Sequence, residues 1–273
     1  MELIIIIMNK KEQHKLFYEL SINYLYKLLP EDLHKTDLEK YFLGDRKDFN
    51  SLEDIFEQLI KSAQNYQRMP NVIKFEQKRE QFKSILFDFN FRQISELSFD
   101  KLYEMFKNNF EIKNFEKKNN CWYKWTKSII DSSKFISDFS NLDDFKKFIS
   151  MFEYNLQTKI ALPLLISKKI SGIGFALACD FLKELGYTDY SKPDVHIKEV
   201  LTALNLSNDD EIQVFEEIGR IAIDCNSIDT FITPYKIDKI IWLICSGKFY
   251  LDNKNIKPHK KEYILLLKKQ LLK

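Results

Sequence analysis

Glycine and proline are scarce in this sequence, with six of each among 273 residues. A β-sandwich or β-barrel needs turns at short intervals, and glycine and proline form many of those turns. Phenylalanine, isoleucine, leucine and lysine are abundant instead, as in chains built from long helices. The composition therefore predicts an all-α or nearly all-α fold, in a chain long enough for one or two domains.

Cysteine is also rare, and the spacing of the four cysteines argues against two kinds of metal site. The four lie far apart and form no Cys-x-x-Cys pair: Cys121, Cys179, Cys225 and Cys245. Zinc ribbons and four-cysteine iron–sulfur clusters use closely spaced thiolates. We therefore expect neither of them, and isolated cysteines fit the reduced interior of the cytoplasm.

Long hydrophobic runs are missing as well. The opening segment from Leu3 to Met8 is apolar, but it is short, has no basic region before it and runs directly into Asn9 and Lys10. A bilayer span needs about 20 apolar residues, and an export signal begins with basic residues. We expect the segment to be a buried strand or helix end, or to precede the true start at Met8, and we expect a cytoplasmic protein without membrane contact.

Charge is nearly balanced overall, with a formal net charge of +2 at pH 7, which by itself does not indicate a nucleic-acid partner. The lysines are nevertheless unevenly spread. Residues 253–273 hold seven lysines and one glutamate, and residues 101–127 hold seven lysines and three glutamates. This distribution is compatible with one basic face, although charge blocks also occur on helices that only face solvent.

Several short polar residues stand at positions typical of helix N-caps. Such a side chain accepts hydrogen bonds from the first helical turn, and an acidic residue often follows three positions later. The pattern fits Ser51 with Asp54, Asn141 with Asp144, Thr36 with Glu39, and Ser207 with Asp210. We expect an N-terminal helical region over residues 1–155 and a second helical region over residues 156–273.

The most informative segment is Ile170-Ser171-Gly172-Ile173-Gly174, which lies between two apolar segments with helical patterns. Two glycines one residue apart allow a sharp turn and leave backbone N–H groups accessible. At the start of a helix, such groups and the helix dipole attract an anion. We expect Ile170 to pack into the core beneath the turn and Gly186 to end the second helix. A tight turn without a ligand is the alternative for this segment taken alone.

A second element follows Gly174 by 20 residues, where Lys192-Pro193-Asp194-Val195-His196 precedes another apolar helical pattern. Proline favours an extended backbone before it, and Asp194 falls where an N-cap is expected. In structural terms Asp194 is a cap. In functional terms its carboxylate can face a sugar held near the phosphate-binding turn.

The two elements together, in this order and spacing, resemble the helix-hairpin-helix, Gly/Pro-Asp superfamily of DNA glycosylases. The resemblance is best between Leu162 and Leu204. Ser171-Gly172-Ile173-Gly174 is similar to the Pro-Gly-Val-Gly turn of that family, with serine in place of proline. Pro193-Asp194-Val195-His196 is similar to the Val-Asp-Val-His segment of 8-oxoguanine glycosylases. The resemblance implies base-excision repair of double-stranded DNA by base flipping, and two helical subdomains flanking a cleft with the hairpin at its mouth.

The resemblance also assigns roles to individual residues. Asp194 would be the catalytic aspartate. The DNA-binding groups would be the backbone N–H groups of Gly172, Gly174 and Leu177, together with His196 and Lys169. The backbone carbonyls of Lys168, Ile170 and Ile173 would hold a monovalent cation, sodium or potassium. No organic cofactor and no iron–sulfur cluster are expected, and the protein would act as a nucleoid-associated monomer.

One position departs from the family pattern. Members that cleave the strand through a Schiff base carry a lysine two residues after the second glycine of the turn, and this sequence has Ala176 there. The resemblance therefore implies a monofunctional hydrolase, unless Lys169, Lys192 or Lys198 replaces the missing lysine.

Two other functions remain open at this stage. A non-catalytic DNA-binding protein would use the hairpin as a phosphate clamp and Asp194 only as a cap, whereas a protein-interaction scaffold would make the two motifs coincidental. For a glycosylase, an alkylated purine, an oxidised purine, uracil or a mismatched thymine are all compatible with these residues. Aromatic residues are too numerous to indicate a base pocket, because phenylalanine at helical spacing usually packs in the core.

Overall fold

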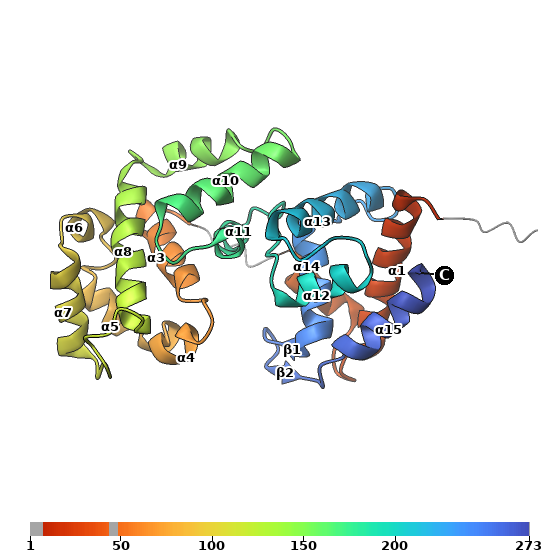
Figure 1. Ribbon diagram of the computed structural model, residues 1–273, viewed down its shortest axis with the longest axis horizontal. Coiled ribbons are helices and arrows are strands. Elements are labelled where there is room, and N and C mark those ends of the chain that lie inside the picture. Colours follow the sequence, from red (N-terminus) through yellow and green to blue (C-terminus); the bar gives the residue numbers. More distant parts are fainter. Residues whose placement is uncertain (1–7, 44–48, 273) are drawn as a thin grey trace, which may run out of the picture. The chain divides into compact units, whose positions relative to one another are not determined.

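The computed structural model describes residues 8–43 and 49–272, and helices dominate them (Figure 1). Within these ranges, strands are confined to the antiparallel pair of β1 (Lys248–Phe249) and β2 (Lys254–Asn255). The all-α prediction is therefore confirmed. The apolar segment expected near the N-terminus falls mostly on residues 1–7, outside the described residues. No helix among the described residues combines the length and the apolar character needed to cross a bilayer.

Contacts divide the chain into two compact units. The terminal unit consists of Met1–Arg46 and Gly186–Lys273, and the central unit consists of Lys47–Leu185. These units do not coincide with regions divided at residue 155, because α1 (Lys10–Leu28) packs against α13 (Glu211–Cys225) and α14 (Pro234–Ser246) near the other end of the chain.

The central unit is organised around α8 (Cys121–Ser137), which contacts α3, α4, α6, α7 and α10. The other helices of this unit are α3 (Leu52–Ala63), α4 (Met69–Ile73), α5 (Arg79–Ile85), α6 (Phe91–Ser95), α7 (Phe99–Asn109), α9 (Leu142–Ser150), α10 (Leu156–Lys169) and α11 (Phe175–Glu184), with a 3-10 turn at Glu76–Lys78. Trp125 is fully buried, stacks on Phe106 and donates a 2.9 Å hydrogen bond to the carbonyl of Ile60. The aromatic core thus fixes α8 as the scaffold of this unit.

The terminal unit is organised around α14, which contacts α1, α2, α12, α13 and α15. The remaining elements are the 3-10 helix Lys35–Leu38, α2 (Glu39–Phe42), α12 (Val195–Ala203) and α15 (Lys260–Leu271). A buried polar cluster joins α1 to α13: Nε2 of His14 lies 2.8 Å from Oε1 of Glu217, and its Nδ1 lies 2.7 Å from Oδ2 of Asp224. This cluster and the apolar core together hold the two ends of the chain in one unit.

The predicted caps are confirmed at two of the four positions. Ser51 accepts from the N–H of Asp54, and Asn141 accepts from the N–H of Asp144, each at the start of a helix. The cap at Thr36 is wrong because that residue lies inside the 3-10 helix. The cap at Ser207 is also wrong, since the residue that caps α13 is the acidic member of its pair, Asp210. Aspartate is itself a strong cap, so the pattern placed this helix start three residues too early.

Candidate nucleic-acid interface

The predicted hairpin joins α10 to α11 within the central unit. Helix α10 ends at Lys169, Ile170 donates its N–H to the carbonyl of Ile166, and α11 begins at Phe175. Ile170 is 1% exposed, which confirms that it packs beneath the turn. Gly186 follows the end of α11 with a φ of +92°, as predicted for a glycine that ends a helix.

The two glycines of the turn have different structural roles. Gly172 has a φ of +82°, in the left-handed region, and a Cβ there would lie 2.8 Å from Oγ of Ser128. Gly174 has an extended backbone with a φ of −86°, and a Cβ there would meet nothing within 4 Å. Gly172 therefore shapes the turn, whereas Gly174 leaves open space at the start of α11.

Helix α8 holds the turn through both peptide groups of Ser171. Oγ of Ser128 donates a 2.6 Å hydrogen bond to the carbonyl of Ser171, and the N–H of Ser171 donates a 2.9 Å hydrogen bond to Oδ2 of Asp131. The sequence did not reveal these partners, because no local pattern links α8 to a turn about 40 residues away. The sequence indicates only that Ser128 and Asp131 are three residues apart and so share one face of a helix.

The start of α11 has the geometry of an anion site. Its N-cap is Gly174, which supplies no side-chain acceptor for the first turn. Leu177 is the third residue of the helix, and the first four N–H groups of a helix have no partner within it. Gly172 and Gly174 are exposed, and so is Lys169 at the end of α10. These groups can therefore meet a phosphate, while the side chain of Leu177 is buried in the core.

The carbonyls assigned to a monovalent cation lie at the same turn. Lys168 is in the last turn of α10, where carbonyl groups lack partners within the helix. The carbonyl of Ile170 accepts a long hydrogen bond of 3.3 Å from the N–H of Ile173 and keeps a second lone pair. Neutral carbonyl oxygens fit a weakly held monovalent cation. Among the described residues, no group of histidine, cysteine, aspartate and glutamate side chains could hold a metal ion.

Asp194 lies in the terminal unit and caps α12, as the sequence predicted. Its Oδ1 accepts hydrogen bonds from the N–H groups of His196 at 2.8 Å and Ile197 at 3.1 Å. Both hydrogen bonds of the carboxylate use Oδ1, so Oδ2 has no hydrogen-bond partner among the described residues. The cap thus fixes the orientation of the carboxylate and leaves one oxygen available for a ligand.

A second carboxylate, Asp238 of α14, supports the segment that carries Asp194. Asp238 is 2% exposed, and its Oδ2 accepts a 2.8 Å hydrogen bond from the N–H of Lys192. Burial raises the pKa of Asp194, and the negative charge of Asp238 raises it further. Sequence reasoning missed Asp238, because it lies within the almost continuously apolar pattern of α14 and far from Asp194 in the chain.

The other charged residues near Asp194 are engaged to different degrees. Nδ1 of His196 lies 3.3 Å from Nζ of Lys260, which also pairs with Glu199. Lys198 is 3.4 Å from the carboxylate of Glu211. His196 is half-buried beside an ammonium group, a position compatible with contact to a phosphate.

Comparison with known proteins gives a structural likeness and no match in sequence. No protein-family model matches the chain, and no curated protein is similar enough in sequence to count as a match. Among solved structures, the chain is similar to an 8-oxoguanine glycosylase/lyase from Methanocaldococcus jannaschii, crystallised in complex with a 15mer DNA containing 8-oxoguanine. The two are 20% identical with a TM-score of 0.52, and the match covers 85% of this chain and 98% of the other. The chain therefore shares the all-α fold of that glycosylase.

Proposed function

We propose that this protein is a DNA base-excision repair glycosylase that flips a damaged or mismatched base out of the duplex and hydrolyses its N-glycosidic bond. The observation that carries the proposal is the carboxylate of Asp194, which two backbone N–H groups hold through Oδ1 while Oδ2 has no partner among the described residues. The fold shared with an 8-oxoguanine glycosylase/lyase supports it.

In the proposed reaction the bond between C1′ and the base nitrogen breaks, and the base leaves with the electron pair. Positive charge develops on the sugar, and the fixed negative charge of Asp194 stabilises it. A water molecule then attacks C1′ and loses a proton, which the carboxylate can accept because its pKa is raised by burial and by Asp238. The departed base takes up a proton in place of the one that water has lost, so the products are a neutral free base and an abasic site.

The hairpin supplies binding in this proposal. The N–H groups of Gly172, Gly174 and Leu177 bind a phosphate of the damaged strand, and Lys169 adds charge beside them. His196 contacts another phosphate. The carbonyls of Lys168, Ile170 and Ile173 can hold sodium or potassium, which would counter the charge of a phosphate near the turn.

The proposed enzyme is monofunctional, because Ala176 has no amine that could attack C1′. Lys169, Lys192 and Lys198 are the lysines that could replace the missing amine. Nζ of Lys198 lies 3.4 Å from Oε1 of Glu211, and Lys169 is exposed at the end of α10. A cytoplasmic, nucleoid-associated monomer without an organic cofactor fits this chemistry.

Purified protein incubated with duplexes that each carry one lesion tests the proposal. We expect release of one class of base and an intact strand until alkali is added, and we expect borohydride to trap no covalent adduct. Release of no base from any lesion or mismatch would contradict the enzyme assignment. A trapped adduct would contradict the monofunctional mechanism.

A DNA clamp without catalysis is the second candidate, and it is favoured by the complete N-cap role of Asp194 at α12. The two candidates differ at this residue. A clamp needs the hairpin glycines and tolerates asparagine at position 194, whereas the glycosylase loses its activity with Asp194→Asn.

A further inference from the structure

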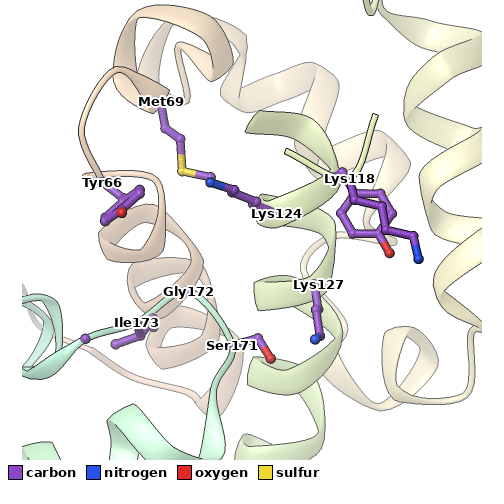
Figure 2. A pocket seen from close by; sticks show the side chains of 10 residues that line it. Tyr66, Met69, Lys118, Lys124, Lys127, Ser171, Gly172 and Ile173 are labelled. Atoms are coloured by element: carbon purple, nitrogen blue, oxygen red, sulfur yellow. The ribbon is translucent and has the colours of Figure 1, made fainter. Parts of the chain in front are cut away.

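A cavity of about 490 Å³ adjoins the hairpin within the central unit (Figure 2). Residues 171–174 of the turn form one part of its lining. Lys124 and Lys127 of α8 form another, together with Lys118 just before that helix and Tyr66 after α3. The volume lies within the range of about 300–1,000 Å³ that is usual for ligand pockets. The cavity is therefore large enough for a ligand that extends beyond the turn.

Three lysines line this cavity, and no aspartate or glutamate is among its lining residues. Lys118, Lys124 and Lys127 are exposed, and none of the three forms an ion pair with another described residue. Lys124 and Lys127 are three residues apart in α8 and so share a helix face. Nζ of Lys124 lies 5.7 Å from the ring centroid of Tyr66.

Two other cations of the same unit are paired with carboxylates. Arg79 pairs with Glu57 at 2.5 Å, and Lys107 lies 3.5 Å from Glu104. Asp131 stands one turn beyond Lys127 in α8, but it does not line the cavity, and its Oδ2 accepts from the N–H of Ser171. The positive charge of the three lysines at the cavity thus lies beside the backbone N–H groups of the turn.

We infer that this cavity binds phosphate groups of a DNA strand, continuing the path of the backbone from the hairpin turn towards the three lysines. The inference rests on the proposed function, because it takes DNA as the ligand. Lysine presents a compact charge on a flexible stem and suits phosphate contacts that do not depend on base sequence. Tyr66 is 40% exposed, and its ring offers a surface for a sugar or base of the same strand.

The composition of the cavity lining favours a DNA strand over a small anion as the ligand. One part of the cavity is the turn itself, which has the geometry of an anion site, and the lysines extend beyond it. A single phosphate would leave much of this charge unused, whereas successive phosphates of one strand can meet the turn and the lysines together.

A salt titration of DNA binding tests the inference. The logarithm of affinity falls against the logarithm of salt concentration with a slope of about −0.9 for each phosphate neutralised on a duplex. The double variant Lys124→Gln/Lys127→Gln should therefore reduce the magnitude of the slope by about 1.8, and weaken binding at low salt by roughly tenfold or more. Thermal unfolding of the same preparations verifies that both variants are folded.

Lys134→Gln/Lys146→Gln is the matched control, because both lysines are exposed in the central unit and neither lines the cavity. The control removes the same net charge, and we expect it to keep the wild-type slope. Equal slopes for the cavity variant and the control would overturn the inference. Inorganic phosphate and a free deoxynucleotide are tested as small anions, and their binding at the lysines with an unchanged DNA slope would also overturn it.

The outcomes separate this inference from the proposed function. A wild-type protein that binds no DNA would contradict both. A wild-type protein that binds and excises bases, and whose cavity variant keeps the wild-type slope, would contradict the cavity assignment alone.

Discussion

The hydroxyl oxygen of Ser128 lies 2.8 Å from the position that a Cβ on residue 172 would occupy. The same hydroxyl donates to the carbonyl of Ser171, so it cannot move away without breaking the bond that anchors the turn. Together with the φ of +82°, this contact makes Gly172 a structural requirement. Gly174 has neither constraint, and the two glycines therefore respond differently to substitution.

We expect Gly172→Ala to lower the free energy of unfolding by about 1–3 kcal/mol, from backbone strain and the clash with Ser128. Gly174→Ser should keep the wild-type stability, because serine is a good N-cap residue and a Cβ there has open space. Its hydroxyl would occupy the N–H groups that bind phosphate. Gly174→Ser should therefore weaken binding to all DNA sequences alike. Chemical unfolding and fluorescence anisotropy measure the two effects, and unchanged affinity would remove the hairpin from the interface.

The variant Asp194→Asn distinguishes the helix-capping role of residue 194 from the role of its negative charge. Asparagine also accepts from the first-turn N–H groups of α12, so the variant should fold and bind DNA. It lacks the negative charge that stabilises the sugar cation, and we expect base excision to fall by roughly two or more orders of magnitude. Single-turnover excision followed by alkali measures this loss. An Asp194→Asn enzyme that excises at the wild-type rate would leave the reaction without its proposed carboxylate.

The pH dependence of excision should reflect the raised pKa of Asp194. Burial first, and the charge of Asp238 second, raise this pKa above the ordinary value of 3.8. Excision should therefore decline on acidification at a higher pH than an unperturbed aspartate would give. Asp238→Asn removes one cause and should move the decline to lower pH. A profile that is identical in both proteins would show that the two carboxylates are not coupled during the reaction.

The raised pKa of Asp194 also affects the stability of the folded protein. A carboxyl group with a raised pKa binds its proton more tightly in the folded state, so stability falls as pH rises from the ordinary value through the raised value. Asp194→Asn removes this loss and should unfold at an equal or higher temperature than the wild type at pH 7. Calorimetry at pH 7 and at pH 4 measures the difference, which should be smaller at the lower pH.

The contribution of Glu217 to stability should change with pH in the opposite direction to that of Asp194. Burial alone would raise its pKa, but hydrogen bonds from His14 and Lys10 outweigh burial and hold the pKa below the usual 4.5. Its contribution to stability is therefore present above about pH 4.5 and lost as pH falls through the lowered pKa. Glu217→Gln should cost about 3 kcal/mol at pH 7 and less in acid. Asp209→Asn, at an exposed position of the same unit, is the control for a general charge effect.

Local chemistry explains what the sequence predicted correctly. The turn, the buried Ile170, the position of Gly186 just after α11 and the cap at Asp194 all depend on residues close together in the chain. The partners of these residues were not predictable, because Ser128 and Asp238 act across 43 and 46 residues respectively. The placement of α1 against α13 had no local signal either, since an apolar face does not specify its partner. The catalytic and DNA-binding roles, the cation at the hairpin and the expected cleft between two subdomains stay predictions.

The composition of the terminal unit has a consequence for synthesis on the ribosome. Helix α1 is made before the central unit, but its partners α13 and α14 follow only after the whole of that unit. At about 5–20 residues per second, the apolar face of α1 waits roughly 10–40 seconds for them. The central unit is continuous in the chain and can fold during this interval. We therefore expect a nascent chain that already presents the hairpin turn, while the apolar face of α1 still lacks its partners and the carboxylate of Asp194 has yet to be positioned.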